Sequence, residues 1–332
     1  MKLYTLHSTD PTLNLAMEEL LTREATEEIF LLWQNAPSII VGCHQNTAAE
    51  IDEEFVQAHD IRVVRRMTGG GAVYHDLGNI NFSCISLEQD WGQDSGKRFS
   101  APIVNALREC GIEAEYAGRN DILANGLKVS GCARSVLKAH TLFHGTLLFD
   151  VQLDVLARAL RPDPEKILSK GIKSVRARVG NLREMLRALN IEMEMPEFVQ
   201  RLMASASHSF GDIPFEEIPA GLREKAEALA DAKYRTWEWN YGTNLPYDVQ
   251  QRLRFAGGGI QARMNIRENR IADLSFTGDF FGSHPVEELI QKIIGLPPRK
   301  EVLLETLRAL PLTEYIAGIT AEELATLLAI SE

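Results

Sequence analysis

The residues best suited to chemistry lie in one run, residues 65–76, which reads RRMTGGGAVYHD. Its two arginines supply planar guanidinium groups, whose forked donors match the oxygens of a carboxylate or a phosphate. The three glycines that follow lack a Cβ, so the chain can adopt positive φ and direct consecutive backbone amides at one anion. The run fits neither GxGxxG nor GxxxxGK followed by Ser or Thr, so it predicts an anion-binding turn that is neither a Rossmann nor a Walker loop.

A second candidate site surrounds Asn125-Gly126, a strong signal for a two-residue hairpin turn. Counting back from this turn pairs Asp121 with Ser130 and makes Asp121 a diagonal neighbour of Lys128 on one side of the ribbon. At that spacing the ammonium and the carboxylate could hold a nucleotide and its metal, or they could form an ordinary ion pair. A lysine that stabilises a carboxylate during attack on a phosphate needs such a rigid strand.

Two further segments carry polar groups with a possible role in binding. His144 precedes Gly145 and an apolar strand, where a histidine is either a satisfied strand-end residue or part of a site. Residues 170–179, KGIKSVRARV, place four cations in a glycine-containing loop without an acid. Such a loop suits a phosphate, and it equally suits a solvated surface.

The composition is that of a globular protein, with 332 residues of which 45% are hydrophobic and 24% charged. A net charge of −11 argues against nonspecific nucleic-acid binding, while local basic stretches favour small anionic ligands. No apolar run reaches the roughly 18 to 20 residues of a membrane span, and the first residues are typical of a strand and not of a signal peptide. We therefore expect a cytoplasmic protein without nucleic-acid or membrane partners.

The cysteines and common enzyme motifs exclude several other classes. The four cysteines lie 22 to 41 residues apart and form no CxxC pair, so neither a disulfide framework nor structural zinc is expected. The sequence also lacks GxSxG, HExxH and a carboxylate-rich calcium loop, which leaves hydrolase and metalloprotease functions with little support.

The motifs fall on a mixed set of helices and strands. Asp10-Pro11, followed by apolar residues at helical spacing, predicts a helix to about Glu24. The glycine turn should join strands at 61–66 and 72–76. The other expected strands lie at 29–33, 38–42 and 79–87, with short strands within 113–150. Helices are expected at 48–59 and 98–110 and within 151–233. A change of pattern near residue 245 predicts a boundary, followed by strands around Glu268-Asn269-Arg270 and helices at 285–294, 300–309 and 320–330.

Taken in order, these segments resemble the lipoate-protein ligase family, whose relatives include octanoyl transferases and biotin-protein ligases. The resemblance is carried by NLAMEE in the first helix, RRMTGGGAVYHDLGN, GRND, KVSGCA, HGTLL, KGIKSVRARV and TWEWNYG. It implies an α+β fold, with a biotin/lipoate-protein ligase catalytic domain of mixed, largely antiparallel sheets flanked by helices over residues 1–245. A small α+β accessory domain would follow over residues 246–332.

The resemblance also implies a reaction. Lipoate attacks the α-phosphate of ATP, with Mg²⁺ as the metal of the nucleotide, to give lipoyl-AMP. A lysine of an apo lipoyl domain then takes the lipoyl group. The implied acceptors are the E2 subunits of 2-oxoacid dehydrogenases, the glycine-cleavage H protein, or both, and the family suggests a monomer without a tightly bound prosthetic group. Such chemistry needs charge neutralisation, in-line alignment and a dry tunnel more than it needs acid-base groups.

Residue roles follow from the matching positions. Lys128 matches the essential lysine, which contacts both the lipoate carboxylate and the adenylate phosphate, and Asp121 is the expected protein contact for magnesium. The residues that match the ATP and adenylate site are Arg66, Gly71, Ala72, Val73, Tyr74, Asn120, Asp121, Lys128, Lys173, Ser174 and Val175. The residues expected at the lipoyl pocket or its mouth are Arg65, Thr68, Gly70, His75, Lys128 and His144.

One departure from the family pattern leaves an alternative open. Where the family often has an arginine directly after the glycine, this chain has Cys43 after Gly42. Some relatives are cysteine-dependent octanoyl transferases that need no ATP, so Cys43 or Cys132 could serve as an acyl-accepting nucleophile. A non-catalytic scaffold that only binds partners is the third hypothesis. The sequence leaves open the choice between lipoate and octanoate and the preferred acceptor protein.

Overall fold

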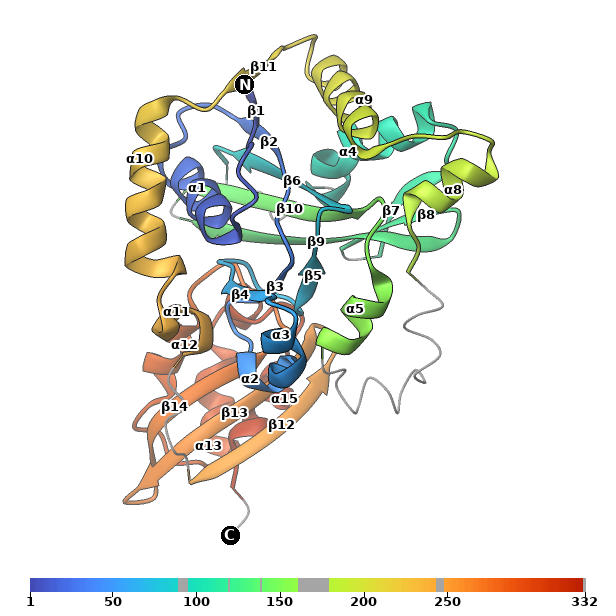
Figure 1. The fold of residues 1–332 in the computed structure, drawn as a ribbon. Helices are drawn as coiled ribbons and strands as arrows, with labels where there is room; N and C mark the ends of the chain where they lie inside the picture. The colour runs from blue at the N-terminus through green and yellow to red at the C-terminus, as the bar shows by residue number, and fades with distance from the viewer. Residues whose placement is uncertain (89–94, 119, 138, 161–178, 243–247, 331–332) are drawn as a thin grey trace.

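A computed structural model describes residues 1–88, 95–118, 120–137, 139–160, 179–242 and 248–330 (Figure 1). Its main sheet has eight strands in the order β11-β1-β2-β6-β10-β9-β8-β7. These strands are β11 (Phe215–Glu217), β1 (Lys2–Thr5), β2 (Ile29–Trp33), β6 (Asn79–Ser86), β10 (His140–Leu148), β9 (Leu127–Leu137), β8 (Asp121–Ala124) and β7 (Ala114–Ala117). β1 is parallel to β11 and β2, and the other pairs are antiparallel, so the sheet is mixed as expected.

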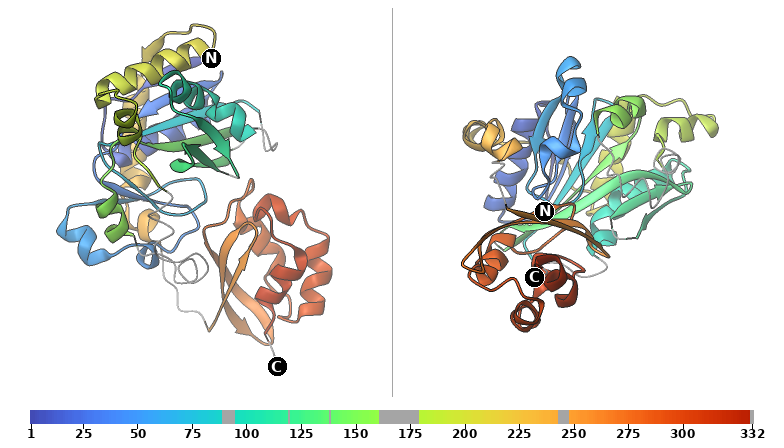
Figure 2. Two further views of the ribbon diagram at one scale, coloured as in Figure 1. Left: turned by 90° about the vertical axis from the view of Figure 1, so that its right-hand side faces the viewer. Right: turned by 90° about the horizontal axis from the view of Figure 1, so that it is seen from below.

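Helices cover both faces of this sheet (Figures 1 and 2). One face packs on α1 (Pro11–Glu24), α10 (Ala220–Leu229) and the π-helix η1 (Ala230–Tyr234). The other packs on α4 (Ser95–Glu109), α8 (Leu182–Ala188) and α9 (Met195–Ser209). α1 begins and ends as predicted, because the Asp10 side chain accepts a hydrogen bond from the Thr12 amide and Pro11 occupies the first turn.

A small sheet carries the glycine turn. β3 (Ser38–Val41) pairs in parallel with β4 (Arg62–Arg65) and antiparallel with β5 (Val73–His75), so the turn joins two strands as expected. The helix predicted over 48–59 is wrong, since the chain forms two short helices, α2 (Thr47–Glu50) and α3 (Glu53–Ala58). Between them, Ile51 bridges Leu160 just after α5 (Leu153–Ala159), and Asp52 caps α3.

The C-terminal residues build their own sheet and core (Figure 2). Its strands are β12 (Val249–Phe255), β13 (Gly258–Arg267) and β14 (Arg270–Gly278), and its helices are α12 (Val286–Ile293), α13 (Lys300–Arg308), α14 (Leu312–Tyr315) and α15 (Ala321–Leu328). Glu268 and Asn269 have φ of 50° and 57°, which is the geometry of the predicted hairpin turn. α11 (Trp237–Tyr241) precedes this unit. None of the helices in the described part of the chain is long and apolar enough to cross a membrane.

Two other strand predictions need correction. β9 and β10 are 11 and 9 residues long, not short strands, because together they run along the centre of the main sheet. β11 lies within a region predicted to be helical. Its three residues are extended because they pair with β1, a partner more than 200 residues earlier in the chain, and local sequence does not report such a contact.

Candidate active site

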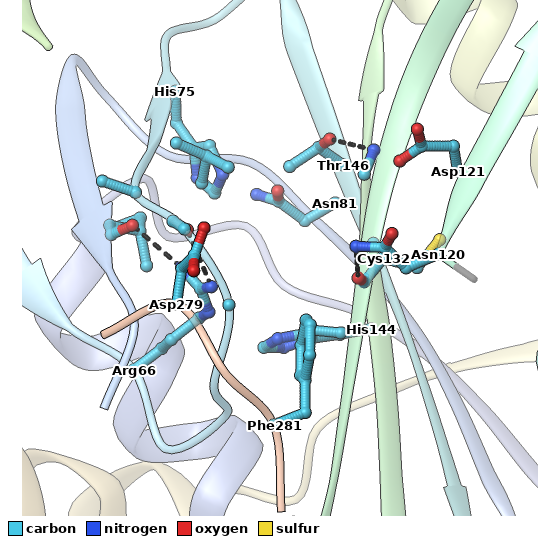
Figure 3. A pocket seen from close by; sticks show the side chains of 18 of the residues that line it. Arg66, His75, Asn81, Asn120, Asp121, Cys132, His144, Thr146, Asp279 and Phe281 are labelled. Carbon is cyan, nitrogen blue, oxygen red and sulfur yellow. Dashed lines mark hydrogen bonds between the residues drawn. The ribbon is translucent and has the colours of Figure 1, made fainter. Parts of the chain in front are cut away.

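A cavity of about 380 Å³ lies between the glycine turn, strands β9 and β10 of the main sheet and a loop from the C-terminal unit (Figure 3). Ten of the predicted site residues line it: Arg66, Gly70, Gly71, Ala72, Val73, His75, Asn120, Asp121, Lys128 and His144. Thr68 and Tyr74 lie behind this lining, and Lys173, Ser174 and Val175 fall outside the described residues. The fold therefore brings together segments that are distant in sequence.

The cavity changes from charged and open at one end to buried at the other. The side chains of Lys128 and Asp121 at the open end are 37% and 34% exposed. At the other end, Trp33 and His75 are 3% exposed and Asn81 is 2% exposed. A ligand with one charged end and one less polar end therefore fits in one direction, with its charge beside Lys128.

Lys128 and Asp121 form the ion pair that the hairpin suggested, with 2.6 Å between Nζ and Oδ1. The counted register is wrong, however, because Asp121 pairs with Gly131 and not with Ser130. A β-bulge at Val129 adds one residue to β9 and shifts every pair beyond it. The Lys128 backbone is fixed from its other side, where its carbonyl accepts a hydrogen bond from the Gly180 amide at 3.1 Å.

The guanidinium group of Arg66 is not directed into open space. Its Nε donates to Thr68 Oγ1 at 2.9 Å, while its two terminal nitrogens donate to the carbonyl oxygens of Ile40, Gly69 and Gly71. The side chain is buried, and burial lowers the pKa of Arg66 to about 10, so it stays cationic at neutral pH. The guanidinium thus shapes the glycine turn from within and places a positive charge at the cavity wall.

Arg65 is not brought to the cavity, and among the described residues it belongs to the support behind it. Its guanidinium donates to the carbonyl oxygens of Gly42, Gln45 and Trp239 at 2.9, 2.7 and 2.7 Å. Its backbone amide donates to Asn240 Oδ1 at 2.9 Å. These contacts tie β4 to α11, so the expected place of Arg65 at the lipoyl pocket or its mouth is not supported by the geometry.

His144 belongs to a buried hydrogen-bond chain and is not an isolated strand-end residue. Its Nδ1 lies 2.9 Å from Glu18 Oε1, and its Nε2 lies 2.8 Å from Thr68 Oγ1. Ser83 Oγ donates to the same Glu18 oxygen at 2.6 Å. The chain continues to Arg66 through Thr68, so it connects helix α1 to the glycine turn. Our site prediction from sequence missed Glu18.

The C-terminal unit completes the cavity with residues that have no motif in the sequence. Asp279 and Phe281 line the cavity, and the Phe280 carbonyl accepts a hydrogen bond from the Gly70 amide at 3.3 Å. The Phe280 ring stacks on His44 with 4.4 Å between centroids. Gly70 has φ of +93°, and a Cβ there would lie 2.8 Å from the Phe281 ring, so both its conformation and its packing require glycine.

Comparison with known proteins identifies the family. The family described as Lipoyl protein ligase A/B catalytic domain matches residues 10–207, and that described as Bacterial lipoate protein ligase C-terminus matches residues 244–328. The chain is 41% identical to "Lipoate--protein ligase 1" of Staphylococcus aureus over 324 residues, which cover 96% of this chain and 97% of that one. The chain belongs to the lipoate-protein ligase family. It is therefore a ligase.

Solved ligases share the fold. P. falciparum LipL1 in complex with lipoate aligns with a TM-score of 0.78 at 25% identity, over 93% of this chain and 94% of that one. A bipartite lipoate protein ligase from Thermoplasma acidophilum, described with its E2 lipoyl domain, aligns with a TM-score of 0.65 at 29% identity. The alignment covers 75% of this chain and 98% of that one. A lipoate-protein ligase A bound with ATP aligns with a TM-score of 0.63 at 28% identity, over 73% of this chain and 98% of that one. The expected ligase fold is confirmed.

The cysteines of this ligase are poor nucleophiles. Burial raises the pKa of both Cys43 and Cys132 to about 12, so each is a neutral thiol at physiological pH. Acyl transfer through cysteine requires the thiolate. Cys132 does line the cavity, but its chemistry does not favour the cysteine-dependent alternative.

Burial of His75 predicts that acid destabilises the ligase. Burial lowers the pKa of His75 from 6.5 to about 3 in the folded chain. Between these values the unfolded chain binds a proton that the folded chain does not, so the free energy of unfolding falls as the pH falls. Lowering the pH from 7 to 5 should cost about 2 kcal/mol through this group. Urea denaturation at both pH values should show that His75→Gln loses this part of the dependence; parallel pH profiles would contradict it.

Proposed function

We propose that the ligase joins lipoate to a protein lysine in two steps at the cavity. A lipoate carboxylate oxygen attacks the α-phosphorus of ATP, which forms lipoyl-AMP as pyrophosphate leaves. The amine of an acceptor lysine then attacks the acyl carbonyl, which forms an amide as AMP leaves. The observation that carries this proposal is the polarity of the cavity, because Lys128 stands at its charged end and a buried end lies beyond.

Lys128 is the proposed catalytic residue. During attack, negative charge concentrates where the carboxylate and the α-phosphate meet, and a fixed ammonium at that point lowers its free energy. The ion pair with Asp121 and the hydrogen bond from Gly180 hold Lys128 in place at the open end. Because its side chain is one-third exposed, an entering ligand can replace Asp121 as its partner.

The two ligands would share the wall that begins at the glycine turn. The adenylate would lie along Gly71, Ala72, Val73 and the backbone of Tyr74, with Asn120, Asp121 and Lys128 opposite and the charge of Arg66 behind the turn. The lipoyl chain would extend past Gly70 and His144 towards His75 at the buried end, with Thr68 holding His144 from behind. Lys173, Ser174 and Val175 remain proposed adenylate residues by resemblance alone.

Magnesium would enter as part of the MgATP substrate. Among the described residues no group of three or more acidic, histidine or cysteine side chains could hold a metal by itself. One carboxylate together with substrate phosphates is a common magnesium environment, and Asp121 can supply that carboxylate at the open end. We expect Asp121→Asn to need about tenfold more Mg²⁺ for half-maximal pyrophosphate exchange. An unchanged magnesium titration would exclude this role.

Several broader features of the protein belong to the same proposal. We assign residues 1–245 to a catalytic domain and 246–332 to an accessory domain, which is supported by their separate sheets and cores. The proposed acceptors are apo lipoyl domains of 2-oxoacid dehydrogenase E2 subunits and the glycine-cleavage H protein. The bipartite ligase described with its E2 lipoyl domain supports the first of these. A monomeric state and a cytoplasmic location stay predictions.

The function is tested by following acceptor mass. Purified protein with lipoate, ATP, Mg²⁺ and an apo lipoyl domain should add one lipoyl group, and omission of ATP should abolish the reaction. Cys43→Ser should keep the ATP-dependent rate within about threefold, because a neutral thiol at this position has no proposed role. Full-rate modification from an acyl-carrier donor without ATP would instead favour the transferase, and binding of lipoyl-AMP without turnover would favour a scaffold.

A further inference from the structure

The buried end of the cavity contains two hydrogen-bond donors without a partner in the described structure. His75 Nε2 and Asn81 Nδ2 are buried nitrogen atoms with no acceptor within reach, and both residues line the cavity. Figure 3 shows the two side chains directed towards one another from different strands. A buried donor that stays unpaired is costly, so an acceptor on the bound ligand is expected here.

A chain of three side chains fixes which nitrogen of His75 carries the proton. The Asn14 amide nitrogen lies 2.9 Å and 2.8 Å from the carbonyl oxygens of Ser8 and Gln34, so it is a donor, and it also donates to Asn35 Oδ1 at 3.0 Å. Asn35 must then use Nδ2 towards His75 Nδ1, 3.1 Å away. His75 Nδ1 is therefore the acceptor, and the proton of the neutral ring is on Nε2.

Asn81 adds the second donor. Its Oδ1 accepts a hydrogen bond from Asn79 Nδ2 at 2.9 Å, which leaves Asn81 Nδ2 without a partner in a residue that lines the cavity. Leu15 and Trp33 add apolar surface to the cavity lining, and the polar atom of Trp33 is already paired because Nε1 donates to Ser83. The buried end therefore combines an apolar wall with two donors, which is an unsuitable place for a plain hydrocarbon terminus.

We propose that His75 Nε2 and Asn81 Nδ2 make the ligase prefer lipoate over octanoate by donating to the sulfur atoms of the dithiolane ring. This inference rests on the proposed function, which places the lipoate carboxylate at Lys128 and the ring at the buried end. Sulfur is a weak but real acceptor, whereas the methyl end of octanoate offers none and would leave both donors unpaired. His75 is then a specificity-determining residue and takes no part in the chemical step.

The test compares three acids in ATP-pyrophosphate exchange: lipoate, octanoate and the cyclopentyl analogue of lipoate, in which methylenes replace both sulfurs. The analogue keeps the shape of the ring and removes only the acceptors. Wild-type protein should use lipoate with a kcat/KM at least about fivefold above that of the analogue. His75→Phe keeps a ring without the donor and should reduce this ratio to about one. His75→Gln keeps a donor near the Nε2 position and should restore most of the preference.

The outcomes separate this inference from the proposed function. Equal use of lipoate and its cyclopentyl analogue by the wild-type protein would overturn the inference while leaving lipoate activation intact. This comparison uses the wild-type protein alone, so it does not depend on whether a variant folds. An unchanged lipoate preference in His75→Phe would overturn the role of His75. Failure of the wild-type protein to activate any of the three acids would overturn the proposed function and this inference together.

Discussion

Replacement of Lys128 by methionine is expected to lower the rate of lipoate-dependent ATP-pyrophosphate exchange by about a thousandfold or more. Methionine keeps the length and much of the volume of the side chain and removes the ammonium. The charge that develops between the carboxylate and the α-phosphate would then lose its fixed counter-charge. The Lys128–Asp121 pair is partly exposed, so its loss should change the free energy of unfolding by no more than about 1 kcal/mol.

A matched control comes from a lysine with a similar ion pair far from the cavity. Lys225 lies 2.8 Å from Glu24, and both side chains are more than two-fifths exposed. Lys225→Met makes the same chemical change and should keep the wild-type exchange rate. Near-normal exchange in Lys128→Met would remove Lys128 from the catalytic step. Equal losses in both variants would point to a general effect of lost positive charge.

Local turn chemistry explains why much of the scaffold around the site is readable from sequence. Asn125 and Gly126 have φ of 49° and 78°, which those residue types tolerate, so the hairpin forms where it was predicted. The bulge at Val129 was not predictable in the same way. The position of the extra residue in β9 depends on how β8 pairs with β7 on one edge and with β9 on the other. No local sequence pattern encodes the position of such a bulge.

The partners of charged side chains were harder to predict than their positions. Arg65 and Arg66 were interpreted as ligand contacts because their type suits anions, yet most of their donors face backbone carbonyls. Those carbonyls belong to β3, the loop that follows it, α11 and the glycine turn, which only the fold brings together. Asp279 and Phe281 were missed for the same reason, since they reach the cavity from the loop after β14 in the C-terminal unit.

Glu18 is different, because its sequence context held a usable signal. It follows Leu15 by three residues and therefore lies on the same, buried side of the first helix. A carboxylate on a buried helical face is rarely tolerated without a partner. The pattern therefore predicts a polar contact inside the protein, and the structure supplies it as His144 and Ser83. The identity of that contact depends on the sheet and could not be read from the helix.

Replacement of Arg66 is expected to have the largest effect on stability and to lower activity as well. Arg66→Met would remove the donors to the carbonyl oxygens of Ile40, Gly69 and Gly71, and the contacts to Ile40 and Gly69 are buried. We expect the free energy of unfolding to fall by about 3 to 5 kcal/mol. The glycine turn would also lose its internal support, and displacement of a binding wall by about 1 Å can lower a rate by about a hundredfold. Urea denaturation and pyrophosphate exchange measure the two effects separately.

Two further variants distinguish the geometry of Arg66 from its charge. Arg66→Lys keeps a cation, but one ammonium cannot reproduce the fork that reaches carbonyls on both sides of the turn, so it should recover little of the lost stability. Arg308→Met removes an exposed guanidinium paired with Glu322 at 2.8 Å and should cost no more than about 1 kcal/mol. Full rescue by lysine would mean that charge at the cavity matters and the fork does not. Normal exchange by a destabilised Arg66→Met would show that catalysis tolerates a displaced turn.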